Sequence, residues 1–509
     1  MNPQDPPAPS LMSLNSQKIG SKFTLERVPE PDDRPPTPGK RHLWGRARYL
    51  VLAASVLCFT AARSNDMTFS FSVICMTGNM SETAESNFPS VDFTSRDLSL
   101  TFAGAGTGAI LAAFPLALLL QQFGGRMVMG ILVLLSSMAT LLLPYAAMTA
   151  SAQEWPISSL LFPLRLLQGT AVAAVMPMMG FVSAHWAPVS EMGNFITLLS
   201  GSGQISQIFT MPISAYLCVN TGWPSAYYFH GTLGIVSAIS FIFLFRNNPK
   251  KHQLVSEIEV QTITDGIVHR KRKEQTIPYR AIATSKPIWA CWISFFGNSF
   301  GFQLILQFMP IYLNKVLHVP VAKTGISAML PPLAQLIVKI VAGIASDKIT
   351  RVSERRKLQI FNSVAMCGCA LFLLPLGFLH HSEATVAIAC ICTAIACLGL
   401  VSCGSMKSAT MVARQYSHFV MSIVQFVVCI AMLAIPFIVS FLAPNNTIEE
   451  WRSIFFFVSA ILFITNLFFC YLCDSEAAPW TVEKFINTKN LPLLSDDPQA
   501  TVATIAEHI

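Results

Sequence analysis

Charge is what this sequence has least of. Asp, Glu, Lys and Arg make up 12% of its 509 residues, about half their share in soluble globular domains. Hydrophobic residues make up 53%, and the mean hydropathy is +0.53. This composition excludes a soluble globular protein and predicts an integral membrane protein that crosses the lipid bilayer many times.

Motifs for catalysis, nucleotide chemistry and metal binding are also missing. The sequence has no Walker motif, no Ser/His/Asp set and no paired acids in its apolar stretches. Two close cysteine pairs, Cys367 with Cys369 and Cys390 with Cys392, have a spacing that puts their members on different helix faces, with no histidine or acid nearby. We therefore predict neither an enzyme nor an ATP-driven pump, and no metal or other cofactor.

The net charge of +7 does not indicate nucleic-acid binding. Lys and Arg are concentrated in particular loops between apolar runs and not on one soluble domain, which is the pattern of membrane topology. Residues 1–45 are polar and proline-rich, which predicts a disordered cytoplasmic arm and not a secretory signal peptide. The first hydrophobic helix would then act as an uncleaved anchor.

Apolar runs of about 20 residues or more predict membrane-spanning helices, and tilted helices can be longer. Twelve such runs occur, at 47–76, 97–120, 127–149, 157–183, 192–219, 224–246, 287–316, 322–346, 355–379, 384–407, 416–442 and 452–473. We therefore expect an all-α protein with twelve transmembrane helices.

The basic residues predict the orientation of these helices. Lys and Arg cluster at 40–48, 250–280 and 348–357, so these segments and both termini are expected in the cytoplasm. Glycosylation sequons begin at Asn79 and Asn445, in loops that this topology places outside, so we expect a glycoprotein.

The longest internal polar stretch divides the chain into two groups of six helices. We expect a cytoplasmic arm at 1–45, a first half at 46–246, a central cytoplasmic loop at 247–285, a second half at 286–474 and a cytoplasmic tail at 475–509. This plan is typical of duplicated transporters, whose substrate site lies between the halves near the middle of the membrane. Alternating access of two rocking halves is the expected mechanism.

Two arginines, Arg63 and Arg165, lie deep within predicted spanning helices. An arginine there costs about 2.5 to 3.5 kcal/mol on insertion scales, so it usually faces a protein or water cavity and marks a substrate path. A guanidinium group suits a carboxylate or a phosphate, which predicts an anion site. The alternative for each arginine is a structural pairing with an acid or with backbone carbonyl groups.

Short motifs along most of 47–480 carry a resemblance to a known family. They include Arg63-Ser64-Asn65, Arg165-Leu166-Leu167-Gln168-Gly169, Trp186-Ala187-Pro188, Gly222-Trp223-Pro224-Ser225 and Met309-Pro310-Ile311-Tyr312. In order and spacing the chain resembles the major facilitator superfamily, and within it the group of sodium/phosphate cotransporters, sialin and vesicular glutamate transporters. The resemblance implies a secondary carrier of organic or inorganic anions, coupled to sodium, protons or membrane potential, with Arg63 and Arg165 as anion contacts.

The chain departs from that family at positions that bear on coupling. Proton-coupled relatives carry a glutamate seven residues after the helix-four arginine, where this chain has Val172. Asp66 is the only acid well inside a predicted span, and relatives generally have an apolar residue there. Because Asp66 lies three residues after Arg63, on the same helix face, we expect it either to take over a coupling role or to neutralise Arg63, which leaves Arg165 as the favoured ligand.

Several other polar residues lie within the predicted helices. Vesicular glutamate carriers place an arginine and a tyrosine where this chain has Asn298 and Gln303, which argues against glutamate as a vesicular cargo; both residues are expected either as cavity donors or as interhelical hydrogen bonders. Lys339 could reach the cavity or extend toward the cytoplasm. His230 could titrate or bond a neighbouring helix, and Asp347 is a candidate gating residue.

The leading hypothesis is a monomeric secondary active transporter of a small anion, placed in the plasma membrane or in a vesicular or lysosomal membrane. The second hypothesis is a non-transporting membrane sensor or partner subunit with the same fold, which the absence of an acid at Val172 makes conceivable. Uptake of labelled anions distinguishes the two hypotheses.

Overall fold

The computed structural model describes residues 46–77, 90–188, 191–264, 278–349 and 351–481, which belong to one compact unit. The predicted arm at 1–45 and the sequon at Asn79 lie outside these residues. The described residues form helices and no strand. This agrees with the all-α prediction.

The first group of long helices comprises α1 (Ala47–Met76), α2 (Ser95–Ala152), α3 (Ile157–Trp186), α4 (Met192–Thr221) and α5 (Trp223–Leu244). The element α2 covers two of the predicted runs, and its helical backbone breaks at Gly124, where φ is +75°. Only glycine adopts such a φ readily. A side chain there would also collide with Asn247, whose Oδ1 accepts a hydrogen bond from the backbone N–H of Arg126 at 3.0 Å.

The second group comprises α8 (Lys286–Ile311), α9 (Val321–Lys348), α10 (Glu354–Leu373), α11 (Ala384–Leu398), α12 (Ser405–Ala413), α13 (Ser417–Leu442) and α14 (Ile448–Leu472). One 3-10 turn, Gly399–Ser402, separates α11 from α12, so these two short helices together cover one predicted run. The segment between the two groups carries the short helices α6 (Glu257–Thr264) and α7 (Tyr279–Ala283).

Helices therefore lie over all twelve predicted runs. Of the described helices, nine are long and apolar enough to cross a membrane. The runs that are not among these nine are 47–76, 97–120 and 192–219, and the first of them contains both Arg63 and Asp66.

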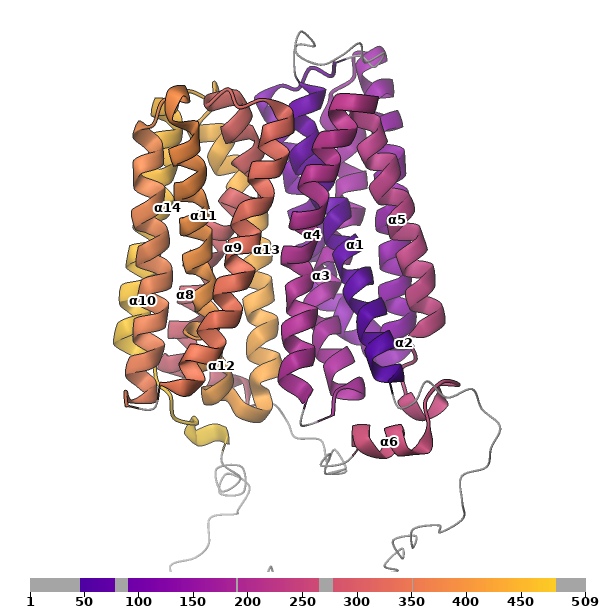
Figure 1. The fold of residues 1–509 in the computed structure, drawn as a ribbon, viewed down its shortest axis with the longest axis vertical. Coiled ribbons are helices and arrows are strands. Elements are labelled where there is room, and N and C mark those ends of the chain that lie inside the picture. Colours follow the sequence, from indigo (N-terminus) through magenta and orange to yellow (C-terminus); the bar gives the residue numbers. More distant parts are fainter. Residues whose placement is uncertain (1–45, 78–89, 189–190, 265–277, 350, 482–509) are drawn as a thin grey trace, which may run out of the picture. The chain divides into compact units, whose positions relative to one another are not determined.

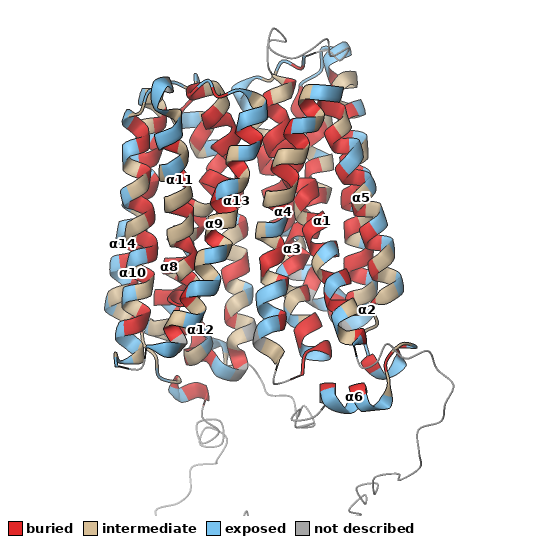
Figure 2. Ribbon diagram, in the orientation of Figure 1, coloured by how far each residue is buried: buried red, intermediate tan, exposed pale blue. Residues whose placement is uncertain are grey.

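The long helices run side by side, with α1 to α5 in one group and α8 to α14 in the other (Figure 1). The two groups meet where α4 packs against α9 and where α2 packs against α13. Buried residues line the helix faces that point inward, and exposed residues lie on the outer faces (Figure 2). Those outer faces carry large apolar side chains such as Phe243, Phe441 and Leu467, which suit contact with lipid.

The short helix α6 is attached to the beginning of α1. The buried carboxylate of Glu259 accepts hydrogen bonds from the backbone N–H groups of Ala47 at 3.3 Å and Arg48 at 2.9 Å. These N–H groups have no partner within α1, so the carboxylate acts as a cap. The Arg48 side chain also pairs with Glu191 at 2.9 Å, which joins α6, α1 and the start of α4.

Candidate functional site

Four consecutive residues of α1, Arg63 to Asp66, point to different neighbours. Each residue of an α-helix is rotated by about 100° from the one before it, so together the four cover every side of α1 at one level. Three of them, Ser64, Asn65 and Asp66, are fully buried. The candidate site is built around this turn of α1.

Asp66 pairs with Arg165 of α3, with 2.8 Å between Asp66 Oδ1 and Arg165 Nη2. Pairing with Arg63 was one of the two roles expected for Asp66 from the sequence, and in this structure Asp66 pairs with Arg165 instead. Positions three residues apart on a helix differ by about 60° around its axis. This difference is enough to direct Asp66 toward α3, while Arg63 points elsewhere.

The remaining donors of Arg165 are also engaged. Its Nη1 donates to the backbone oxygen of Asp66 at 3.1 Å and to Gln168 Oε1 at 2.7 Å, and the guanidinium lies 5.0 Å from the centre of the Phe69 ring. Gln168 in turn donates to Thr140 at 2.7 Å. Arg165 is therefore both buried and charge-compensated.

Glycines on α2 and α3 allow this close approach. A Cβ atom on Gly104 would lie 2.9 Å from Arg165 Cβ, and one on Gly169 would collide with the backbone of Ala105. Small residues at such interfaces let helix backbones come close together in membrane proteins. The glycine in the Arg165-Leu166-Leu167-Gln168-Gly169 motif thus serves the packing that buries the ion pair.

Arg63 is in a different situation. It is half-buried, and within the described part of the chain it forms no ion pair, while its buried Nε has no hydrogen-bond acceptor. It lies close to Asp66 and, on α13 of the second helix group, to Cys429. Arg63 therefore lies where the two groups face each other.

The other two residues of this turn make interhelical hydrogen bonds. Asn65 Nδ2 donates to the hydroxyl groups of Ser136 at 3.2 Å and Ser137 at 3.0 Å on α2. Ser64 Oγ lies 2.9 Å from His230 Nδ1 on α5, and His230 Nε2 lies 3.2 Å from Ser214 Oγ on α4. His230 thus occupies the interhelical bonding position that the sequence analysis gave as one of its two alternatives.

The second helix group presents neutral amides. Gln303 and Gln307 of α8 and Gln425 of α13 are buried, and none of their Oε1 atoms has a hydrogen-bond donor among the described residues. Gln307 Nε2 donates to the backbone oxygen of Met432 at 3.5 Å, and Gln425 Nε2 lies 3.4 Å from Cys429 Sγ. Asn298, the other predicted donor on α8, is half-buried.

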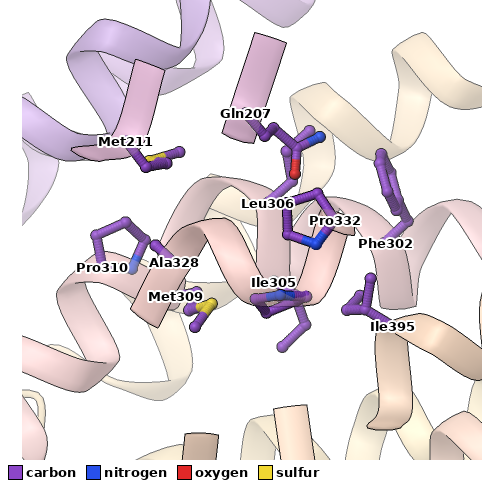
Figure 3. A pocket seen from close by; sticks show the side chains of 11 residues that line it. Gln207, Met211, Phe302, Ile305, Leu306, Met309, Pro310, Ala328, Pro332 and Ile395 are labelled. Atoms are coloured by element: carbon purple, nitrogen blue, oxygen red, sulfur yellow. The ribbon is translucent and has the colours of Figure 1, made fainter. Parts of the chain in front are cut away.

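A pocket also lies between α4 and the second group (Figure 3). Its lining is Gln207 and Met211 from α4, Phe302, Ile305, Leu306, Met309 and Pro310 from α8, Ala328, Pro331 and Pro332 from α9, and Ile395 from α11. Gln207 is its one polar side chain, and neither arginine reaches it. This pocket alone cannot hold an anion.

Polar contacts join α4 to α9 near this pocket. Lys339 Nζ donates to Ser200 Oγ at 2.8 Å, and Gln204 Nε2 donates to Gln335 Oε1 at 3.1 Å. Lys339 lies nine residues before the end of α9, or about 13 Å along the helix. Its ammonium group therefore bonds α4 of the other helix group, a contact that matches neither of its two predicted roles.

The last positions named in the sequence analysis are Asp347, Val172 and Asn445. The side chain of Asp347 lies outside the described part of the structure. Val172 is buried in α3 with 2% exposure, so an apolar group stands at the position where proton-coupled relatives have an acid. Asn445 is exposed, and its amide donates to Glu450 at 3.0 Å beside the cap of α14.

Gln168, Gln307, Gln425 and Glu259 were not predicted as site residues from the sequence. Gln168 could have been found, because it lies three residues after Arg165 and therefore on nearly the same helix face. The two glutamines of the second group carry no such local signal. Their importance depends on which helices face α1.

Two hydrogen bonds join the helix groups at the end opposite α6. There Ser440 Oγ donates to the backbone oxygen of Ser95 at 3.2 Å, and Lys315 Nζ donates to that of Thr77 at 3.2 Å. Toward the α6 end, Cβ atoms built on Gly180 and Gly343 would meet nothing within 4 Å. The two groups are thus joined at the end opposite α6, and open space lies beside these two glycines at the other end.

Comparisons with known proteins agree with this architecture. Residues 52–436 match the family model of the Major Facilitator Superfamily. Human sialin is 26% identical over 378 residues, covering 74% of this chain and 75% of sialin. Mouse sodium-dependent phosphate transport protein 1 is 26% identical over 382 residues, covering 74% and 80%. A probable vesicular glutamate transporter of Caenorhabditis elegans is 26% identical over 401 residues, covering 77% and 68%.

Solved structures show the same fold. The xylose transporter of E. coli, in a partially occluded inward-open conformation, has a TM-score of 0.60 at 13% identity and covers 84% of this chain and 97% of that one. A bacterial homologue of the human lysosomal transporter Spinster, inward-facing and unoccupied, has a TM-score of 0.62 at 14% identity with the same coverage. This chain is therefore an integral multi-pass membrane transporter of the Major Facilitator Superfamily, related to sialin, to sodium-dependent phosphate transport proteins and to vesicular glutamate transporters.

Proposed function

We propose that this protein is a secondary active transporter of small organic or inorganic anions that works by alternating access. It crosses the membrane twelve times with both termini in the cytoplasm, and its halves, 46–246 and 286–474, rock around a site near the midplane. The observation that carries this proposal is Arg63, a cation between the two helix groups with no ion-pair partner among the described residues.

An unpaired guanidinium at this depth needs a compensating ligand. Burying such a charge costs several kcal/mol unless an opposite charge or hydrogen bonds compensate it. An anion that binds Arg63 would supply that compensation and would gain charge-assisted hydrogen bonds in return. Arg63 is therefore the first anion contact, although the sequence alone favoured Arg165.

Arg165 has a supporting role in this proposal. Its charge is balanced by Asp66, and the pair fixes α1 against α3 at the level of Arg63. The amides of Asn298 and Gln303 on α8 supply neutral donors from the second half. The anion is then held between one cation of the first half and polar groups of the second half.

The distribution of contacts supports an inward-facing conformation. If α6 lies in the cytoplasm, as the positive-inside rule implies, the contacts of Ser95 and Thr77 close the outer side. The open space beside Gly180 and Gly343 then lies on the cytoplasmic side. The similar solved structures are in inward-open or inward-facing conformations, which agrees with this orientation.

Coupling to an ion is the second part of the proposal. With Val172 in place of an acid, the buried carboxylate of Asp66 is the group to which we assign the coupling role. Protonation of Asp66 would release Arg165 and change the charge of the site. If sodium is the coupling ion instead, uptake will depend on a sodium gradient, and replacement of Asp66 by Asn will leave the pH dependence of uptake unchanged.

The experiment is uptake into liposomes that contain the purified protein. Labelled phosphate, sialate, urate and glutamate are each tested under imposed sodium, proton and voltage gradients. We expect at least one anion to be accumulated, uptake to be lost in Arg63→Ala, and partial uptake to be kept in Arg63→Lys. Folded protein that accumulates no anion under any gradient would favour the sensor hypothesis.

A further inference from the structure

The charges around Arg63 can be summed. Arg63, Arg165 and Asp66 are the charged side chains at this level of α1 and α3, and together they carry one net positive charge. This net charge is the same whether Asp66 pairs with Arg63 or with Arg165. Across the interface, Gln303 and Gln307 of α8 and Gln425 of α13 are amides, which add no charge.

We propose that the site accepts anions with a single negative charge and discriminates against dianions, with Asp66 setting this preference. This inference deepens the proposed anion transport and rests on it. A monoanion brings the net charge of the occupied site to zero. A dianion leaves one uncompensated negative charge in a region of low dielectric constant, where an unpaired charge is costly.

The amides define the rest of the substrate class. Gln303, Gln307 and Gln425 are buried, and each has an Oε1 atom without a donor among the described residues. An acceptor without a donor costs free energy when it is buried. Donors on the substrate, such as hydroxyl or N–H groups, would satisfy these atoms. The inferred substrate is therefore a monoanion that also carries neutral hydrogen-bond donors.

Lys339 is the cation that could invalidate this sum. It lies about 13 Å from the end of α9, whereas Arg63 lies sixteen residues, or about 24 Å, from the start of α1. Its ammonium group is bonded to Ser200 on α4, and it does not line the turn that carries Arg63. We place Lys339 outside the site, and the experiment includes it.

The test compares the uptake of monoanions and dianions by the full-length protein in liposomes at pH 7.5. Urate and sialate serve as monoanions, and succinate and sulfate serve as dianions. For the wild type we expect kcat/KM to be at least about tenfold higher for the better monoanion than for either dianion, a difference that one charge-assisted hydrogen bond can produce. Asp66→Asn, which raises the net charge to two, should shift this ratio about tenfold or more toward dianions.

Three further variants extend the test, and the first of them keeps the result interpretable if Asp66→Asn folds poorly. Asn298→Arg adds a charge from the second half without disturbing the ion pair, and it should shift the ratio in the same direction. In the double variant Asp66→Asn with Gln425→Glu the net charge is restored, and the monoanion preference should return. Lys339→Gln should keep the wild-type ratio.

Efficient dianion uptake by the wild type would overturn the inference and leave anion transport standing. The inference is also overturned if neither Asp66→Asn nor Asn298→Arg changes the ratio of kcat/KM between monoanions and dianions. It is overturned as well if Lys339→Gln removes the monoanion preference. If folded protein, checked by size-exclusion chromatography, transports none of these four anions and also neither phosphate nor glutamate, the proposed function is contradicted as well.

Discussion

Asp66 Oδ1 and Arg165 Nη2 lie 2.8 Å apart, and both side chains are only 2% exposed. The pair joins α1 to α3 in the interior of the first helix group. Removing one partner of a buried pair leaves the other charge unpaired, which usually costs about 3 to 5 kcal/mol, whereas replacing both partners costs much less.

The first prediction concerns this pair. Asp66→Ala should lower the free energy of unfolding by about 3 to 5 kcal/mol, and Asp66→Ala combined with Arg165→Met should recover most of the loss. Thermal unfolding of the purified protein in detergent measures both changes. Additive effects of the two substitutions would show that the contact contributes little energy.

The second prediction separates stability from transport at Arg63. Because this arginine has no ion-pair partner among the described residues, Arg63→Leu should leave the protein at least as stable as the wild type, and more stable by about 1 to 3 kcal/mol if the full insertion cost is regained. The same variant should lose anion uptake. A large loss of stability in Arg63→Leu would mean that the arginine has a structural partner.

The third prediction concerns pH. Hydrogen bonds from Arg48 and, secondarily, from Tyr49 lower the pKa of Glu191 below its ordinary value, against the opposing effect of burial. A lowered pKa means that this contact contributes stability above the ordinary value of about 4.3 and loses it as the pH falls through the lowered pKa. Glu191→Gln should therefore lower the melting temperature at pH 7 and reduce its fall between about pH 5 and 3.

The exposed Glu257 on α6 offers the matched control for that experiment. Glu257→Gln should keep the wild-type pH profile of the melting temperature. If Glu191→Gln and Glu257→Gln give the same profile, the contact between Arg48 and Glu191 does not contribute to acid stability.

The fourth prediction concerns the cap of α1. Glu259 accepts hydrogen bonds from the backbone N–H groups of Ala47 and Arg48, and losing such a cap costs about 0.5 to 2 kcal/mol. Glu259→Ala should therefore lower the melting temperature and increase proteolytic cleavage between α5 and α8. Glu257→Ala, two residues away on the same short helix, should cleave at the wild-type rate, and equal cleavage of both variants would exclude a specific role for the cap.

Much of the fold could be predicted from the sequence. Helices lie over all twelve predicted runs, because long apolar runs have few alternatives to a helix. The family was also recognisable from short motifs, and the match to the superfamily model confirms it. The break at Gly124 lies between two predicted runs, and its conformation suits glycine.

The candidate site was only partly predictable. The deep arginines stood out because charge is so rare in these runs. The partner of Asp66 could not be identified, because local spacing places it near Arg63, whereas the contact with Arg165 depends on how closely α3 packs against α1. Gln307 and Gln425 are inconspicuous in the sequence for the same reason, since only the packing of α8 and α13 brings their amides to the interface.

The turn of α1 from Arg63 to Asp66 also restricts how this helix can move. Ser64, Asn65 and Asp66 are bonded to three different neighbours in the first helix group. A rotation of α1 about its own axis would break all three connections at once. Arg63 is therefore carried as a fixed part of a rigid body, and its access to either side of the membrane must change through displacement of the opposite wall and not through a twist of the helix that bears it.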